Sequence, residues 1–312
     1  MRAIANGIKV VVRSAEPRQT AQEGNRPLLK VNVAKSDGPG PVNEDVVGHC
    51  PGAAWVIDGA TGVGAALLEA PSDAAWLANM ADAELRSVLI QSPDTPTRDL
   101  VRSVIERCRD ALGRHALREP DGSHEHPSAA FAMVRVMDGG VEFATLADCR
   151  IAYTGEDGNA QLFGTTALGA IEGKTIALVE RIIDLHPGIT PAELKEAVLP
   201  QLRENRRLMN KPDGYWVLGT EPAAAEHLDV MRMPVDAGRR FAIASDGYLR
   251  LVELFAVATP HDLLAIDDDE AFAKWLYTLR DLERTEGSCR RYPRVKVHDD
   301  ASFLHCEFQG EG

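Results

Sequence analysis

The order of strands and helices constrains the fold of this chain more than any other feature of the sequence. Apolar runs bounded by turn residues predict groups of strands, and two stretches between those groups carry apolar residues at helical spacing. The first helical stretch follows the capping residue Ser72 and continues after a second cap at Thr97 or Thr95; the other covers 172–210, with a helix start at Thr190. This order differs from the strict alternation of a doubly wound parallel sheet. We therefore expect an α+β fold in layers, in which helix pairs cover antiparallel sheets.

The strands themselves favour antiparallel pairing. Residues 128–137 and 141–147 flank an Asp-Gly-Gly turn, which is typical of a hairpin, and 150–155 continues the meander. The remaining expected strands are 8–13, 27–34, 53–58, 215–219, 227–233, 240–245 and 301–308. Because no linker divides the chain, we expect a single domain over residues 1–312.

Charge and cysteine content narrow the class of protein. The chain has 34 basic and 47 acidic residues and a net charge of −13, which disfavours nucleic acid as a partner and suits a protein that gathers cations. Five cysteines without a CxxC pair indicate reduced thiols rather than a disulfide framework or a zinc site. No apolar stretch is long enough for a bilayer span, and the first residues do not form a signal peptide. These features predict a cytoplasmic protein with no membrane partner.

Acidic residues stand at the ends of several expected strands. Asp58 and Asp246 each end an apolar run and precede a glycine, and the pair Asp299 and Asp300 opens the last strand. Any one of them alone is readily explained as a turn residue, since Asp-Gly is common in turns. Several carboxylates at the mouth of a hydrophobic sheet are more easily explained by a common cation. The sequence therefore predicts one shared site for divalent metal ions.

Five motifs, in order along nearly the whole chain, carry a family resemblance: NED (43–45), WVIDGATG (55–62), ATLADCRIAY (144–153), FAIASDG (241–247) and HDDASFLHCEF (298–308). Each motif is weak by itself, but their order is specific. The chain resembles the metal-dependent serine/threonine protein phosphatases of the PPM/PP2C type. The resemblance implies a four-layer α-β-β-α sandwich of two antiparallel sheets flanked by helix pairs.

The same resemblance assigns the metal ligands. Asp58 would bridge two Mn²⁺ or Mg²⁺ ions, the carbonyl of Gly59 would bind one of them, and Asp246 and Asp299 would hold the other. Glu44 would act mainly through metal-bound water. Hard oxygen ligands of this kind suit both cations. Asp148 matches a position that holds a third, weaker ion together with Asp246; alternatively, Asp148 is a hairpin residue paired with Arg150.

Two departures from the family concern the substrate phosphate and the leaving group. Where the family often has a phosphate-binding arginine, four residues before Glu44, this chain has Gly40, and the nearest basic residue is Lys35. Ala60 stands where many members have a histidine that could protonate the leaving group, so a metal-bound water would take that role.

Basic residues near the end of the second helical stretch offer a further anion contact. The cluster consists of Arg203, Arg206, Arg207 and Lys211. It either contacts a phosphopeptide or is a solvated helix end stabilised by the helix dipole, and the second interpretation is the simpler one. The candidate substrate-binding residues are thus Lys35, Arg206 and Arg207.

The resemblance implies a protein phosphatase. It would hydrolyse phosphoserine or phosphothreonine on proteins by attack of a water activated between two metal ions, and a cognate serine/threonine kinase would be a further partner. A hypothesis from another class is a pseudophosphatase that binds a phosphoprotein or regulatory partner without turnover. A phosphotransferase with an aspartyl-phosphate intermediate would need a second aspartate beside Asp58, and VIDGA has one.

Overall fold

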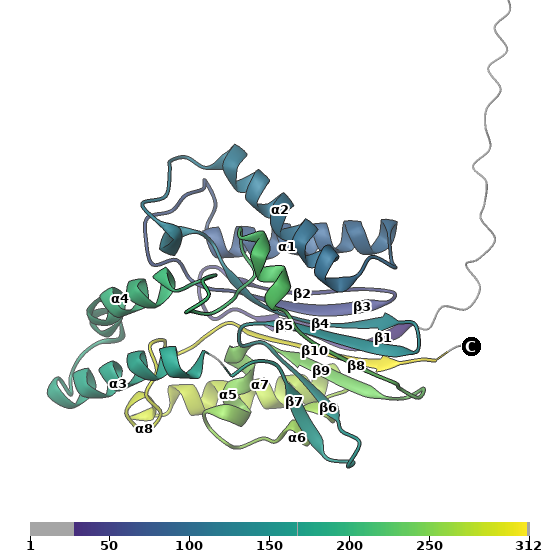
Figure 1. Ribbon diagram of the computed structural model, residues 1–312. Coiled ribbons are helices and arrows are strands. Elements are labelled where there is room, and N and C mark those ends of the chain that lie inside the picture. Colours follow the sequence, from purple (N-terminus) through teal and green to yellow (C-terminus); the bar gives the residue numbers. More distant parts are fainter. Residues whose placement is uncertain (1–27, 167, 311–312) are drawn as a thin grey trace, which may run out of the picture.

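The computed structural model describes residues 28–166 and 168–310 (Figure 1). The strands are β1 (Leu29–Asp37), β2 (Asp45–Cys50), β3 (Ala53–Gly59), β4 (Ala129–Met137), β5 (Gly140–Leu146), β6 (Arg150–Thr154), β7 (Ala160–Phe163), β8 (Asp229–Met233), β9 (Arg240–Ala244) and β10 (Ala301–Phe308). The helices are α1 (Asp73–Gln91), α2 (Thr97–His115), α3 (Gly169–Leu185), α4 (Pro191–Arg207), α5 (Asp246–Glu253), α6 (Pro260–Leu264), α7 (Asp269–Arg284) and α8 (Ser288–Arg291), with short 3₁₀ turns at Ser123–Glu125 and Pro222–His227. The strand expected over 8–13 lies outside the described residues.

Two five-stranded antiparallel sheets form the centre of the molecule. Their strand orders are β1-β10-β9-β6-β7 and β2-β3-β4-β5-β8. Side chains from both inner faces pack together, and Phe143 on β5 meets Phe241 on β9 edge to face with ring centroids 5.4 Å apart. Helices α1 and α2 cover the outer face of the second sheet, and α5, α6 and α7 cover that of the first (Figure 1). The expected α-β-β-α sandwich of antiparallel sheets is confirmed.

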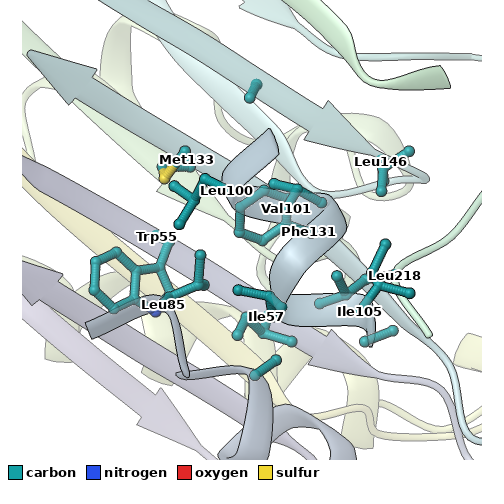
Figure 2. Packing of buried hydrophobic residues seen from close by; sticks show 14 of the residues in the cluster. Trp55, Ile57, Leu85, Leu100, Val101, Ile105, Phe131, Met133, Leu146 and Leu218 are labelled. Atoms are coloured by element: carbon teal, nitrogen blue, oxygen red, sulfur yellow. The ribbon is translucent and has the colours of Figure 1, made fainter. Parts of the chain in front are cut away.

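The layer under α1 and α2 shows how successive residues of β3 point to opposite faces of the sheet. Figure 2 shows Trp55 and Ile57 of β3 and Phe131 of β4 facing side chains of the two helices, among them Leu85 and Leu100. On β3 the alternate residues Ala54 and Val56 face the other sheet instead. The strand is therefore apolar on both faces, as expected for a central strand between two layers.

The starts of α1 and α2 differ in how they are capped. Ser72 accepts hydrogen bonds from the backbone N–H groups of Ala74 and Ala75, as its sequence position predicted. For α2 the expected cap at Thr97 or Thr95 is wrong, because the N-cap residue is Pro96 and makes no side-chain cap. The hydroxyl of Thr97 instead accepts a hydrogen bond from the buried Arg135 guanidinium at 3.0 Å.

The helix pair at 172–210 does not cover a sheet. Helices α3 and α4 form an arm at one end of the sandwich (Figure 1), and their apolar side chains pack mainly on each other, in a small cluster of Val179, Ile183, Leu194 and Val198. The cover of the first sheet comes instead from α5, α6 and α7, nearer the C-terminus.

Two strand predictions also need correction. Residues 215–219 form isolated bridges at Tyr215 and Leu218 rather than a strand. Residues 45–50, expected to be a connection, form the edge strand β2. In the part of the chain that the structure describes, no helix has both the length and the apolar character needed to cross a bilayer.

Candidate functional site

Carboxylates from distant parts of the sequence converge at one end of the two sheets. Asp58 ends β3 and faces Asp45, the first residue of β2, as its partner in the antiparallel register. Asp148 lies in the turn between β5 and β6, Asp246 follows β9, and Asp299 precedes β10. The negative charges of the other four all act on Asp58, so these five side chains are neighbours. The structure thus brings together Asp58, Asp148, Asp246 and Asp299, which the sequence singled out, and adds Asp45.

The electrostatics of this cluster favour a cation. Burial raises the pKa of Asp58 well above its usual range, and the charges of Asp45 and Asp246 raise it further. Burial likewise raises the pKa values of Asp148 and Asp246, with repulsion between carboxylates as the next cause. Carboxylates held this close are costly to ionise together unless a positive charge compensates them.

Asp45 shows this cost most clearly. It is 7% exposed, and within the described residues neither of its carboxylate oxygens has a hydrogen-bond partner. Burial raises its pKa to about 7, the nearby charges of Asp300 and Asp246 act in the same direction, and the hydroxyl groups of Ser302 and Ser245 lie near enough to lower it in part. Hard oxygens beside other carboxylates are the donors that Mg²⁺ and Mn²⁺ prefer. Asp45 was not identified from the sequence because its place depends on strand β2, which was not expected.

Glu44 is held by hydroxyl groups. Its Oε1 accepts a hydrogen bond from Ser72, the N-cap residue of α1, and its Oε2 accepts one from Thr61. Its backbone N–H donates to Oδ2 of Asp300 at 2.7 Å. These bonds fix Glu44 beside the cluster and orient its carboxylate, in keeping with a role through water rather than as a direct ligand.

The glycines after Asp58 and Asp246 are required by close backbone contacts. A Cβ atom on Gly59 would lie 2.4 Å from the carbonyl oxygen of Glu44, and one on Gly247 would lie 1.9 Å from that of Asp300. Each Asp-Gly pair therefore lets one strand end approach another element of the site closely. These two contacts explain why a glycine follows each aspartate: it lets the chain segments that carry the carboxylates pack closely together.

Asp299 differs from the other carboxylates because two cationic side chains already bind it. Lys296 Nζ donates to Oδ1 at 2.7 Å, and Arg250 Nη2 donates to Oδ2 at 2.9 Å. Burial disfavours the charge of Lys296, but the carboxylates of Asp299 and Asp246 outweigh it and raise the pKa of the ammonium group. Neither cation was singled out from the sequence, where nothing distinguishes Lys296 or Arg250 from surface residues.

The three candidate anion-binding residues lie in different places. Lys35 pairs with Asp269 at the start of α7 at 2.7 Å, away from the carboxylates, and Arg207 is exposed and pairs with Glu204. Arg206 is partly buried and donates to the hydroxyl of Ser128 at 2.9 Å and to the carbonyl of Thr61 at 3.0 Å. The simpler interpretation of the basic cluster as a solvated helix end therefore holds for Arg207 and is wrong for Arg206.

The charge of Arg206 also interacts with acidic residues of the site. Burial lowers the pKa of its guanidinium group, while Glu44 and Asp148 are among the groups that raise it. Of the three candidates, Arg206 is the one whose charge interacts with the site.

Asp148 has both acidic and basic groups around it. Burial and the charges of Asp246 and Glu172 raise its pKa, and the charge of Arg150 lowers it in part. Arg150, the alternative partner considered for it, donates to the carbonyl of Gly164 and lies 3.6 Å from Glu253. Glu172, in the first turn of α3, was not expected at the site.

The donor set fits divalent cations chemically. However, among the described residues no three carboxylate, histidine or cysteine side chains are arranged to ligate one ion together. Asp299 in particular is held by Lys296 and Arg250.

Comparisons with known proteins identify the family and agree with the fold. The sequence profile of a family described as protein phosphatase 2C matches residues 40–291. No curated protein matched the sequence. The serine/threonine phosphatase PstP/Ppp of Mycobacterium tuberculosis is similar in structure, with 14% identity, a TM-score of 0.55, and coverage of 90% of this chain and 99% of that one. A PstP catalytic domain in complex with two manganese ions has 14% identity, a TM-score of 0.53, and coverage of 91% and 100%. The phosphatase MsPP of Mycobacterium smegmatis, in complex with cacodylate, has 19% identity, a TM-score of 0.52, and coverage of 90% and 99%.

Proposed function

Because this chain belongs to the protein phosphatase 2C family, we propose that it is a metal-dependent protein phosphatase that hydrolyses phosphoserine and phosphothreonine. One observation carries the proposal: carboxylates from five separate segments meet at one end of the sandwich, and the charges of the other four raise the pKa of the buried Asp58. Such a cluster is unfavourable in a metal-free fold and is accounted for by binding of divalent cations.

Each residue of the cluster has a proposed role. Asp58 lies between the other carboxylates and would bridge two ions, with the carbonyl of Gly59 as a further ligand of one. Asp246 and Asp299 would hold the other ion, and Glu44, fixed by Thr61 and Ser72, would orient water. When bound, two such cations lower the pKa of a water between them and neutralise phosphoryl oxygens.

A third cation is proposed beside Asp148. Its neighbours Asp246 and Glu172 would supply further oxygen donors once their side chains turn toward the ion; the charges of both raise the pKa of Asp148, and the charge of Asp246 raises that of Glu172. Glu172 lies at the start of α3, so this ion would connect the helical arm to the sheets.

Arg206 is the proposed ligand of the substrate phosphate. Its hydrogen bonds to Ser128 and Thr61 use one N–H of each terminal nitrogen, which leaves further donors of the planar guanidinium for an anion. Its position near Glu44 and Asp148 would compensate for Gly40, where the family often has an arginine.

The alternative, a pseudophosphatase, is favoured by one specific observation. Both oxygens of Asp299 accept hydrogen bonds from Lys296 and Arg250, so a metal ion would compete with two resident cations for this carboxylate. If the resident cations prevail, the protein would bind a phosphorylated partner without hydrolysing it.

Hydrolysis assays separate the two functions. Activity on p-nitrophenyl phosphate and on a phosphothreonine peptide would be measured with Mn²⁺, with Mg²⁺ and with EDTA. We expect Mn²⁺-dependent turnover that falls about 100-fold or more in Asp58→Asn and in Asp246→Asn. The matched control Asp269→Asn, which removes an exposed carboxylate outside the site, should keep wild-type turnover.

The opposite result would favour the binding module. Phosphopeptide binding that is unchanged in EDTA, with no turnover at any metal concentration, would contradict the phosphatase and support the pseudophosphatase.

A further inference from the structure

The segment before β10 places Lys296 beside Asp299, one of the proposed metal ligands. Lys296 lies in the connection between α8 and β10, and its ammonium group is 2.7 Å from Oδ1 of Asp299. The same oxygen accepts the backbone N–H of Asp300 at 3.2 Å, and the other oxygen accepts Arg250 at 2.9 Å. Both carboxylate oxygens of Asp299 thus already accept hydrogen bonds from groups of the protein itself.

The connection that carries Lys296 is firmly anchored. The buried guanidinium of Arg294 donates to the carbonyls of Tyr292, Val297 and Glu283 and to the hydroxyl of Ser288. His298 contacts Glu283 at 2.9 Å. Because the backbone on both sides is held, Lys296 is placed at Asp299 by the fold rather than by a chance surface contact.

The ion-pair network around Asp299 is already balanced in charge. It contains three basic residues and three carboxylates: Lys296, Arg250 and Arg280 with Asp299, Glu283 and Asp37. Within this network, a cation that binds Asp299 meets the repulsion of Lys296 and Arg250 and competes with them for its oxygens, while the charges of Asp58 and Asp246 attract it. Departure of one resident cation removes part of that repulsion.

Lys296 is the resident cation that can leave. Its side chain is 36% exposed, and within residues 28–166 and 168–310 its ammonium has one ion-pair partner, Asp299. Arg250 is 10% exposed and also bonds the fully buried Glu283 at 2.6 Å, so moving it would leave a buried carboxylate with one partner fewer. Rotation of the flexible four-carbon side chain of Lys296 can move its ammonium into solvent, at the cost of its attraction to Asp299 and Asp246.

We infer that Lys296 is a built-in counter-ion that occupies Asp299 in the metal-free protein and competes with the divalent cation for it. This inference rests on the proposed metal site. Its consequence is that the affinity for the ion at Asp299 is lower than the carboxylates alone would give. The occupancy of that ion, and with it the activity, would then follow the concentration of free metal.

Metal binding measured by calorimetry tests the inference without any activity assay. Titration of wild-type protein with MnCl₂ gives the dissociation constant, and Lys296→Gln should lower the dissociation constant of the weaker ion about tenfold. Lys296→Arg, which keeps the charge, should bind Mn²⁺ no more tightly than wild type.

Lys35→Gln is the matched control. The side chain of Lys35 is 43% exposed, which is similar to that of Lys296. Its ion pair with Asp269, on the outer face of the first sheet, has the same length of 2.7 Å as the pair of Lys296 with Asp299. Lys35→Gln removes one positive charge from the chain, as Lys296→Gln does, so it measures any general gain in cation affinity. Binding by Lys296→Gln that is no tighter than binding by Lys35→Gln would overturn the inference.

A folding measurement covers the case in which Lys296→Gln is unstable without metal. If this variant is unfolded in EDTA, its folding is followed against Mn²⁺ concentration. Folding at concentrations below the wild-type dissociation constant supports the inference, and failure to fold at saturating Mn²⁺ overturns it.

The failure of the inference differs from the failure of the proposed function. If wild-type protein binds Mn²⁺ and hydrolyses substrate while Lys296→Gln binds no more tightly than the control, only the inference is wrong. If neither wild type nor Lys296→Gln binds Mn²⁺, both are wrong.

Discussion

The pH dependence of stability gives a direct test of the strained carboxylate cluster. Asp45 is buried and its pKa is raised from 3.8 to about 7, chiefly by burial. Between these two values the folded protein keeps a proton on Asp45 that the unfolded chain has lost. The stability contributed by this group is therefore present at low pH and is lost as the pH rises toward 7. Where Asp45 is protonated in the folded protein and ionised in the unfolded chain, the free energy of unfolding falls by about 1.4 kcal/mol per pH unit. Between pH 5 and pH 7.5 this condition holds over about two units, because Asp45 ionises in the folded protein near pH 7. The loss of stability is therefore about 2.5 kcal/mol.

The assay compares wild type with Asp45→Asn in EDTA. Urea denaturation would be measured at several pH values from 5 to 7.5, and the difference in free energy of unfolding between the two proteins would be followed. We expect Asp45→Asn to gain about 2.5 kcal/mol relative to wild type over this range. The comparison is needed because burial lowers the pKa values of His126 and His305, and these groups make the total stability rise with pH. Both histidines are present in both proteins, so their effect cancels.

Parallel curves would contradict this prediction. They would mean that Asp45 is ionised in the folded protein throughout the range, as an unstrained or stabilised carboxylate is, because the unfolded chain is also ionised above about pH 5. With saturating Mn²⁺ the gain of the variant should shrink, because a nearby cation favours the ionised carboxylate.

Three further predictions concern other parts of the structure. Gly247→Ala should lower the free energy of unfolding by about 3 kcal/mol in urea denaturation, because the new Cβ would overlap the carbonyl oxygen of Asp300; a loss under about 1 kcal/mol would contradict this contact. Arg206→Lys should raise KM for p-nitrophenyl phosphate about tenfold with little change in kcat, since lysine keeps the charge without the guanidinium fork; an unchanged KM would remove Arg206 from the phosphate site. Thr190→Ala should destabilise α4 by about 1 kcal/mol, measured by amide hydrogen exchange, because it breaks the capping box with Glu193, and unchanged exchange in the first turn would argue against the cap.

The fold was predictable where a local pattern decided the structure. The apolar period of α2 and the Asp-Gly-Gly turn between β4 and β5 depend on neighbouring residues alone, and both elements are present. The cover of the first sheet was not predictable in this way. The helices at 172–210 are amphipathic, but whether their apolar faces meet a sheet or each other depends on chain path, and they meet each other.

The residues of the candidate site also fall into those that a local pattern identifies and those whose place depends on the path of the chain. Asp58, Asp246 and Asp299 each stand at a strand end, so the sequence could place them at the edge of a sheet, and the fold brings those ends together. Asp45 and Lys296 could not be found by this rule. The first depends on the register of β2 against β3, and the second on a connection whose path is set by the buried Arg294.

Position along a strand explains why Lys35, although near Gly40 in the sequence, pairs with Asp269 on the outer face of the first sheet. Lys35 is the basic residue nearest to Gly40, but side chains on a strand alternate between faces. Val33 belongs to the apolar layer under α7, and Lys35, two residues later on β1, lies on the same outer face and pairs with Asp269. Arg206 is distant in sequence yet hydrogen-bonds to Thr61, three residues after Asp58. A phosphate ligand carried by α4 would make substrate binding depend on how the α3–α4 arm sits against the sheets, which a ligand on β1 would not.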